Sequence, residues 1–515
     1  MNLLNPHRSL QTIAILAICL ISLQSCKKEA ENNLPNIIYI LADDLGYGDV
    51  SAFNPNAAWN TKHIDRIAAE GMRFTDAHTG SAVCTPTRYG VLTGRYAWRS
   101  RLKEGVLWSW DEPLIESSEM TVGKLLKNQG YSTACIGKWH LGLGWQYHQE
   151  NPDSADFARP VTGGPNAVGF DYFFGITASL DIPPYVYFEN DLPTVVPVEY
   201  TESKSEMGWW RKGLTGNDFE HEQVLPVLTE KAVTFIQEHV GSDDEKPFFL
   251  YFPLPSPHTP ILPTDEFKGK SKTNPYGDFM LQVDWTVGEI LKTLDKLGIE
   301  DETLVIFTSD NGCSPQADFE ELARFGHDPS YTFRGAKADI YEGGHHVPFV
   351  VRWPGKVAPG SRSNQVICLT DLLATAAAIT GDELDPAAGV DSYNLLPALF
   401  QETETQIREA TIHHSINGSF AIRKGQWKLI MCPGSGGWSD PKPGSPAEAE
   451  LLPFQLYNLE SDIEETQNLY KEYPDVANEL QQLLENCILN GRSTSGTNQS
   501  NSPEDPWPGL EWLTE

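Results

Sequence analysis

Three continuous apolar runs constrain the fold of this chain more than any other feature. Residues 36–41, 248–252 and 303–307 are rich in β-branched or aromatic side chains and show no polar alternation. Runs of this kind are typical of parallel strands that are covered on both faces of a sheet. Between them, segments 61–71 and 280–297 carry apolar residues at helical spacing. We therefore predict an α/β fold with a central, mostly parallel sheet.

Polar side chains follow each predicted strand at the point where it ends. The first run continues into Asp43 and Asp44, the second into His258, and the third into Asp310 and Asn311. In open α/β sheets, ligands bind outside the carboxyl ends of the strands. We therefore expect these side chains to converge on one site.

The acidic and amide side chains of this set predict a metal site. Asp43, Asp44, Asp310 and Asn311 offer up to four oxygen ligands, and no His or Cys accompanies them at zinc-like spacing. An all-oxygen set favours Ca²⁺ or Mg²⁺ over zinc or copper. The alternative is that these residues only form turns and caps.

The charge of the chain argues against one class of partner. There are 70 Asp and Glu against 38 Lys and Arg, a formal net charge of −32. No basic face is evident that would neutralise nucleic-acid phosphates, so we predict no nucleic-acid partner. An anionic small substrate would need a local cluster of cations.

The first residues indicate export. His7 and Arg8 precede an apolar run, 13–23, which is too short to span a bilayer and is typical of a secretory signal. The sequence Leu-Gln-Ser-Cys at 23–26 resembles a bacterial lipobox, which implies cleavage before Cys26 and a membrane anchor through its lipid. An ordinary signal peptide is the alternative. Either way, the periplasm, outer membrane or cell surface is the expected location.

Four segments are expected along the chain. Residues 1–25 form the lipoprotein signal peptide, 26–34 a tether, 35–385 the catalytic domain, and 386–515 a C-terminal subdomain. Within the subdomain, 421–430 predicts a hairpin, 433–446 a loop and 474–489 an amphipathic helix. This combination predicts a small α+β unit.

The cysteines beyond the signal segment match neither a zinc site nor a small disulfide scaffold. Their wide spacing leaves one or two disulfides open, without a pairing; they are Cys84, Cys135, Cys313, Cys368, Cys432 and Cys487.

Cys84 begins a motif of its own. Cys84-Thr85-Pro86-Thr87-Arg88, followed by Thr93-Gly94-Arg95, resembles the maturation motif of the formylglycine-dependent sulfatases, the arylsulfatase-like members of the alkaline phosphatase superfamily. Further matches occur in order at 35–46, 137–142, 257–260, 309–312 and 333–337, and in the C-terminal part at 456–459 with 468–469. The resemblance implies an alkaline-phosphatase-like α/β sandwich with a small C-terminal subdomain. It also implies a sulfuric ester hydrolase.

The resemblance explains why a cysteine is present. A sulfatase-maturating enzyme would oxidise Cys84 to formylglycine (3-oxoalanine), whose hydrate carries two hydroxyls. One oxygen attacks sulfur and gives a covalent sulfate. The second hydroxyl lets the hemiacetal collapse and expel sulfate, an exit that a serine would lack.

The resemblance also assigns roles to the other residues. Arg88 holds the hydrated aldehyde, Lys138 and Lys337 clamp sulfate oxygens, His258 protonates the leaving alcohol, His140 breaks down the hemiacetal, Ser179 contacts sulfate, and Asp43, Asp44, Asp310 and Asn311 bind one Ca²⁺. Asp310 is also a candidate base for the attacking hydroxyl. Two departures are expected to have little effect on the chemistry: His346, where many relatives carry arginine, and Thr61-Lys62-His63-Ile64-Asp65.

The expected substrate is a sulfated glycan. Candidate sugar-binding segments are 181–190, His413 with His414, and 434–440 with Trp438; His414 is the substrate-binding prediction among them, although a core role is equally open. Two alternative functions remain. One is a phosphodiester or phosphonate hydrolase of the same superfamily, and the other is a catalytically silent glycan-binding lipoprotein.

Overall fold

The computed structural model describes residues 34–148, 151–242, 246–501 and 509–513. The predicted signal peptide and Cys26 lie outside the described residues. None of the described helices is long and apolar enough to cross a membrane. Residues 36–515 form one compact unit, so the boundary between 385 and 386 stays a prediction.

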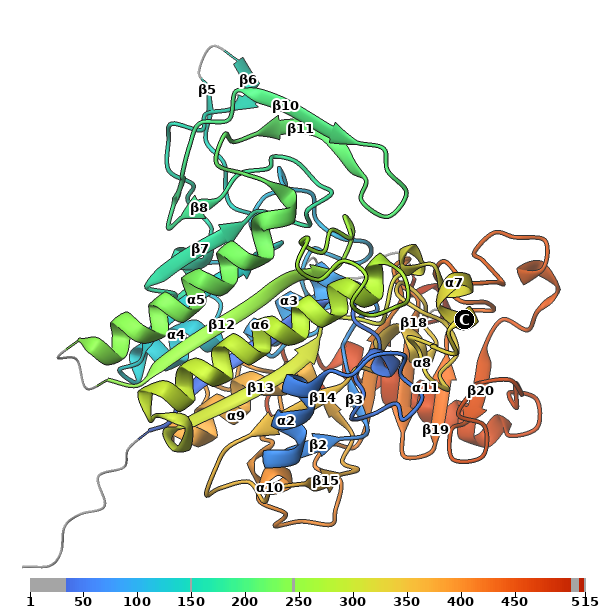
Figure 1. The fold of residues 1–515 in the computed structure, drawn as a ribbon. Helices are drawn as coiled ribbons and strands as arrows, with labels where there is room; N and C mark the ends of the chain where they lie inside the picture. The colour runs from blue at the N-terminus through green and yellow to red at the C-terminus, as the bar shows by residue number, and fades with distance from the viewer. Residues whose placement is uncertain (1–33, 149–150, 243–245, 502–508, 514–515) are drawn as a thin grey trace, which may run out of the picture. The chain divides into compact units, whose positions relative to one another are not determined.

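A ten-stranded sheet forms the centre of this unit (Figure 1). Five neighbouring strands, β13-β1-β12-β4-β7, run parallel, and antiparallel strands extend the sheet on both sides. The three predicted strands are its central members, and each is buried along its length. In sheet order the strands are β15 (Ser361–Ser363), β2 (Met72–Phe74), β14 (Phe349–Arg352), β13 (Thr303–Ser309), β1 (Asn36–Asp43), β12 (Phe248–Pro257), β4 (Ser132–Lys138), β7 (Tyr172–Ile176), β8 (Phe188–Glu189) and β9 (Leu192–Pro193).

Helices cover both faces of the sheet (Figure 1). On one face α2 (Lys62–Glu70) and α5 (Val224–Gly241) pack against α6 (Pro275–Leu297). On the other, α3 (Cys84–Thr93) and α4 (Val122–Asn128) pack against α9 (Leu372–Thr380). The predicted mostly parallel α/β sandwich is confirmed.

The ends of α6 follow from its sequence. The Asn274 side chain accepts a hydrogen bond from the backbone N–H of Gly277 (3.3 Å), and Pro275 occupies the first helical position. At the other end Gly298 adopts a left-handed conformation with φ of 68°, which terminates helices at low cost because glycine lacks a Cβ. The helix therefore starts five residues before the predicted segment 280–297 and stops at its predicted end.

A second, antiparallel sheet lies in the C-terminal part. Its order is β17 (Thr411–His414), β18 (Phe420–Lys424), β19 (Trp427–Ile430) and β20 (Gln455–Asn458), and α11 (Pro474–Leu489) packs on it. The predicted hairpin and helix are therefore confirmed. The remaining elements with a bearing on the site are β3 (Ala77–His78), β16 (Ile367–Cys368), β10 (Glu199–Ser203), β11 (Trp210–Thr215), α7 (Phe319–Arg324), α8 (Glu342–His345) and α10 (Leu396–Leu399).

All six cysteines of the described residues are buried and carry free thiols. The part of the chain that the structure describes therefore contains none of the disulfides that the sequence left open.

Candidate active site

The carboxyl ends of the parallel strands bring the predicted acidic residues together. Register pairs Ala42 of β1 with Ser309 of β13, so the residues that follow these positions lie next to one another. The backbone N–H of Asp44 donates to Oδ1 of Asp310 (3.2 Å). Asp44 itself has a positive φ of 63°, a conformation that costs energy for a residue with a Cβ and that occurs often at functional sites.

Two oxygen atoms in this cluster accept no hydrogen bond within the described residues, although Oδ1 of Asp43 lies 3.6 Å from Nη2 of Arg88. The Asn311 amide nitrogen donates to Oδ1 of Asp44 (2.8 Å) and to the carbonyl of Gly312 (2.9 Å), which fixes the amide orientation. Within the described residues, Oδ1 of Asn311 and Oδ1 of Asp43 are buried without a hydrogen-bond partner. Buried oxygens normally have one.

These unpartnered oxygens fit a bound cation. Asp43, Asp44, Asp310 and Asn311 are almost fully buried, and carboxylate and amide oxygens are the ligands that hard divalent cations prefer. Burial, together with the nearby charge of Asp43, raises the pKa of Asp310. Adding a positive charge between the carboxylates would remove this mutual repulsion.

Three buried cations surround the acidic cluster. Nζ of Lys138, at the end of β4, lies 2.6 Å from Oδ2 of Asp43. Nζ of Lys337 lies 2.7 Å from Asp44. The Arg88 guanidinium donates to Oδ2 of Asp310 through Nε (3.0 Å) and Nη2 (2.7 Å), and through Nη1 to the carbonyl of Lys138 (3.0 Å). Three cations of an acidic protein thus lie beside three buried carboxylates at one site.

Cys84 faces this charged cluster from the first turn of α3. Its sulfur lies within 4.8 Å of carboxylate oxygens of Asp43 and Asp310, and its side chain is buried. Burial raises the pKa of the Cys84 thiol, while the charges of Lys138 and Lys337 act in the opposite direction. A group bound at position 84 is therefore in reach of both the cations and the oxygen cluster.

His258 follows β12 between two cis peptide bonds, Ser256–Pro257 and Thr259–Pro260. Its Nδ1 donates to the Thr259 carbonyl, which leaves Nε2 facing the cluster, 3.6 Å from Oδ2 of Asp44. Nδ1 is also 4.0 Å from Oδ1 of Asp181. His258 therefore belongs to the same site as the acidic residues.

His140 has a different environment. Its backbone is left-handed, with φ of 59°, and its Nε2 lies 2.8 Å from the Leu107 carbonyl. Nε2 must carry the proton, so Nδ1, which is buried without a partner in the described residues, is an acceptor. Burial, with the charges of Lys138 and Arg88, lowers the pKa of His140. The ring is therefore neutral near neutral pH.

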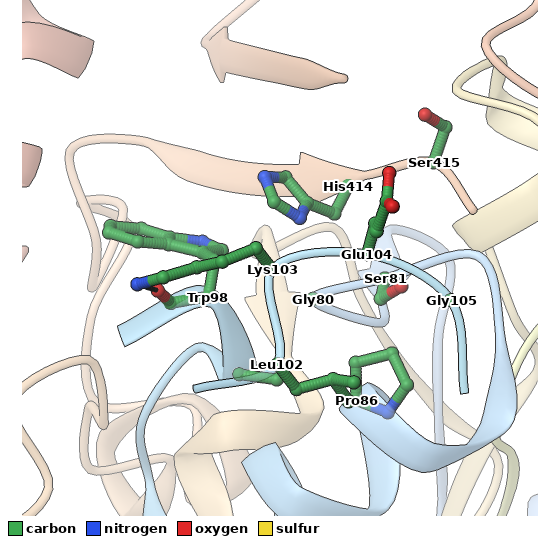
Figure 2. Close-up of a pocket in the computed structure, with 11 residues that line it drawn as sticks. Gly80, Ser81, Pro86, Trp98, Leu102, Lys103, Glu104, Gly105, His414 and Ser415 are labelled. Atoms are coloured by element: carbon green, nitrogen blue, oxygen red, sulfur yellow. Dashed lines mark hydrogen bonds between the residues drawn. The ribbon is translucent and has the colours of Figure 1, made fainter. Parts of the chain in front are cut away.

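Within the described residues, the side chains of two predicted substrate contacts, Ser179 and His414, make no hydrogen bond to the acidic cluster. Ser179 is buried in the loop after β7, and within the described residues its side chain makes no hydrogen bond to the other predicted site residues. His414 borders a separate hollow lined by Ser81, Pro86, Trp98 and Lys103 (Figure 2). Burial lowers the pKa of His414 to about 3, with Lys103 adding to the effect.

The hollow beside His414 is too small for a sugar. Its water-accessible volume is about 10 Å³, about enough for one water molecule. The backbone of His414 instead holds the chain that leads to Cys84, because its N–H donates to Gly80 (3.2 Å) and its carbonyl accepts from Ala82 (2.8 Å). His413 is fully buried. A substrate contact for His414 stays a prediction.

Asp339 was not predicted from the sequence, and it connects two loops near the site. Asp339 accepts hydrogen bonds from the backbone N–H groups of Trp438 (2.8 Å) and Ser439 (3.0 Å). This contact joins the loop of Lys337 to the loop 434–440, and Nζ of Lys337 lies 5.9 Å from the centre of the Trp438 ring. The ring of His346 stacks on that of Phe333, with ring centres 4.1 Å apart. Phe333 lies in the same loop as Lys337. Within the described residues, His346 makes no hydrogen bond to the acidic cluster.

Comparison with known proteins agrees with this geometry. The family model described as "Sulfatase" matches residues 35–382. An N-acetylgalactosamine-6-O-sulfatase of Bacteroides thetaiotaomicron is 36% identical, covering 92% of this chain and 96% of the relative. Human arylsulfatase A is 32% identical, covering 92% and 91%.

A solved structure described under glycosaminoglycan metabolism by Bacteroides thetaiotaomicron superposes with a TM-score of 0.76. It is 36% identical, and the match covers 88% of this chain and 99% of that one. The predicted sulfuric ester hydrolase is thereby confirmed at the level of family. The chain belongs to the sulfatase family and shares its fold.

Proposed function

We propose that this protein hydrolyses a sulfate ester of a carbohydrate at the site around Cys84. The observation that carries the proposal is the position of Cys84 itself. It starts α3 within 4.8 Å of two carboxylates of an oxygen-rich cluster, and the charges of Lys138 and Lys337 act on its sulfur. A nucleophile, cations for an anionic ester and metal ligands thus lie together at one site.

Sulfate ester hydrolysis at this site would require a modified Cys84 and a bound metal ion. Formylglycine made from Cys84 by a maturating enzyme would supply a hydrated aldehyde as nucleophile, and Ca²⁺ held by Asp43, Asp44, Asp310 and Asn311 would supply Lewis acidity. The all-oxygen set of side chains favours Ca²⁺ or Mg²⁺ over zinc or copper, and calcium is proposed because the family resemblance implies it.

The cations of the chain bind and orient the sulfate. Lys138, at the end of β4, and Lys337, in the loop between α7 and α8, present ammonium groups, and each is held by a carboxylate of the cluster. Arg88 is fixed by its two bonds to Asp310 and its bond to the Lys138 carbonyl. Preorganised charges of this kind stabilise charge that develops during reaction without reorganisation cost.

The two histidines have complementary proton roles. His258 holds its Nδ1 proton on the Thr259 carbonyl, so Nε2 is the atom that delivers a proton to the leaving alcohol. His140 holds its proton on Leu107, so its free Nδ1 accepts a proton at position 84. A base must be neutral to act, and the lowered pKa of His140 keeps it so.

The carbohydrate assignment is supported by the relatives. A bacterial relative that is 36% identical over 92% of this chain is named an N-acetylgalactosamine-6-O-sulfatase. We further propose that the protein is exported and lipid-anchored through Cys26 at the periplasmic side or cell surface, where sulfated glycans are met. The panel of sulfated sugars described below identifies the sugar and the sulfate position that are cleaved.

The test combines mass spectrometry with product release. Peptide mass spectrometry across Cys84, on protein from a host with a maturating enzyme, is expected to show an aldehyde in place of the thiol. A panel of sulfated sugars and matched phosphoesters is then assayed for sulfate and phosphate release, with Cys84→Ala as control. Sulfate release lost in the control supports the proposal. Faster phosphate release favours a phosphoester hydrolase, and no release from an aldehyde-bearing protein favours a silent glycan binder.

A further inference from the structure

Beyond His258, a chain of contacts leads from the site to its rim. Oδ1 of Asp181 lies 4.0 Å from Nδ1 of His258, and Oδ2 of Asp181 forms an ion pair with Nη1 of Arg211. Arg211 belongs to β11, which is fixed beside Asp181 because the N–H of Tyr185 donates to the Leu214 carbonyl (2.8 Å). The sugar that leaves with the ester oxygen must lie on this side, next to His258.

Asp181 has an unused acceptor. Its side chain is 9% exposed, and within the described residues Oδ1 is buried without a hydrogen-bond partner. Such an oxygen costs free energy unless a donor reaches it. A sugar hydroxyl beside His258 is a donor of the right kind, because sugars present hydroxyls on every face.

Arg211 is positioned by Asp181 and still has hydrogen-bond donors available. Nη1 is occupied by Asp181, whereas Nε and Nη2 have no partner among the residues that the structure describes, and the side chain is 41% exposed. The guanidinium lies 5.2 Å from the ring centre of Trp108 and 4.9 Å from that of Trp209. The planar fork is thereby preorganised for an oxyanion, which guanidinium binds bidentately.

The two chain neighbours of Trp108 are anchored, one to His140 and the other to Thr177. The carbonyl of Leu107 accepts from His140, and the Ser109 hydroxyl lies 3.1 Å from that of Thr177. Trp108 itself is 49% exposed. Indole faces exposed in this manner stack on sugar rings, and the tie to His140 fixes Trp108 at the site rather than elsewhere on the surface.

We propose that Asp181, Arg211 and Trp108 form a subsite for a sugar bearing an oxyanion, either a carboxylate or a second sulfate, next to the sulfated sugar. This inference rests on the proposed sulfatase function. The protein carries a net charge of −32 and repels polyanions in general. A stacked arginine at the rim would attract an anionic glycan. It would also give the enzyme a preference for an anionic neighbouring sugar, which Lys138 and Lys337 cannot provide because they bind the sulfate that is cleaved.

The test uses substrates that differ only in the neighbouring sugar. They are N-acetylgalactosamine 6-sulfate alone, and the same sugar linked to galactose, to glucuronic acid, or to a sulfated galactose. The variants are Arg211→Gln, Trp108→Ala and, as matched control, Lys212→Gln, which removes one positive charge from the next, exposed position of β11. Binding to each saccharide is also measured by calorimetry in a Cys84→Ala background, so that the result does not depend on turnover.

Arg211→Gln is expected to weaken binding and kcat/KM for anionic neighbours at least about tenfold, the usual effect of losing charge-assisted hydrogen bonds. The sugar alone and the galactose-linked sugar should change little, and Lys212→Gln should leave all four substrates unchanged. The carboxylate and sulfate arms identify the source of the oxyanion. Equal effects of Arg211→Gln on neutral and anionic saccharides overturn the subsite, even when sulfate release itself is intact. Absence of sulfate release from every substrate by the unaltered enzyme refutes the proposed function instead.

Discussion

Replacing Asp284 by asparagine is expected to stabilise the protein at neutral pH. Asp284 lies on α6, is 3% exposed, and accepts hydrogen bonds through Oδ1 from the N–H groups of His63 and Ile64 (both 2.9 Å) at the start of α2. Burial raises its pKa to about 7, with the charge of Asp65 adding to the effect and the backbone hydrogen bonds opposing it. Asparagine keeps the acceptor oxygen and removes the buried charge.

The sign and size of the effect follow from linkage. In the unfolded chain the pKa of an aspartate is about 3.9, so the folded protein binds this proton more tightly than the unfolded chain. The stabilising effect of the proton is fully present below about pH 4 and is lost as the pH rises toward 7. A shift of about three pKa units corresponds to roughly 4 kcal/mol between these limits.

The measurement is urea unfolding, followed by tryptophan fluorescence, at pH 4.5, 6.0 and 7.5. The free energy of unfolding of Asp284→Asn relative to the unaltered protein is expected to rise across this series by a few kcal/mol, up to the limit of about 4 kcal/mol. Asp295→Asn, on the same helix but in an exposed ion pair with Arg66, serves as control and should show no such rise. A difference that stays constant with pH would refute the reasoning, because it would mean that Asp284 titrates alike in both states.

Three further predictions concern the site. His258→Ala should slow hydrolysis of sugar sulfates far more than that of 4-nitrophenyl sulfate, whose leaving group needs no proton, and equal losses would remove the acid role. Gly137→Ala should lower the free energy of unfolding in urea by several kcal/mol, because a Cβ at position 137 would lie 1.9 Å from the Pro253 carbonyl oxygen and Gly137 has a φ of +137°. An unchanged unfolding midpoint would contradict this packing. Removal of divalent cations by a chelator should abolish sulfate release and lower Tm, with calcium restoring both. Full activity in excess chelator would exclude the metal site.

The sequence predicted the central strands and several helix ends because their signals are local. Residues 36–41 and 303–307 are continuous apolar runs that only a sheet covered on both faces can bury. Gly298 stops α6 at the predicted end with a left-handed backbone, as its side-chain-free Cα allows. The short strands β15, at one edge of the sheet, and β2, next to it, were not predicted, since three residues carry too little pattern to distinguish a strand from a loop.

For the candidate site, the sequence predicted which residues come together but not their individual hydrogen-bond partners. The carboxyl ends of parallel strands lie at the same edge of a sheet, which brings Asp43 and Asp310 together whatever the details of packing. The alternation of strands with helices, and the polar residues that follow each strand, were therefore sufficient to expect one cluster. Individual side-chain partners were not accessible in this way. That His140 donates from Nε2 and keeps Nδ1 free depends on where Leu107 passes, and no spacing in the sequence encodes that path.

The sequence by itself therefore determined the fold class, the family and the residues at the strand ends, because periodicity, caps and contiguous motifs act over a few residues. Only the tertiary structure decided that Arg211 meets Asp181 and Trp108, positions 30 and about 100 residues distant in the chain. It also placed His414 beside a hollow of about 10 Å³ rather than in the acidic cluster. Contacts across such separations are selected by packing of whole elements, whose free energy is spread over many residues and leaves no local mark.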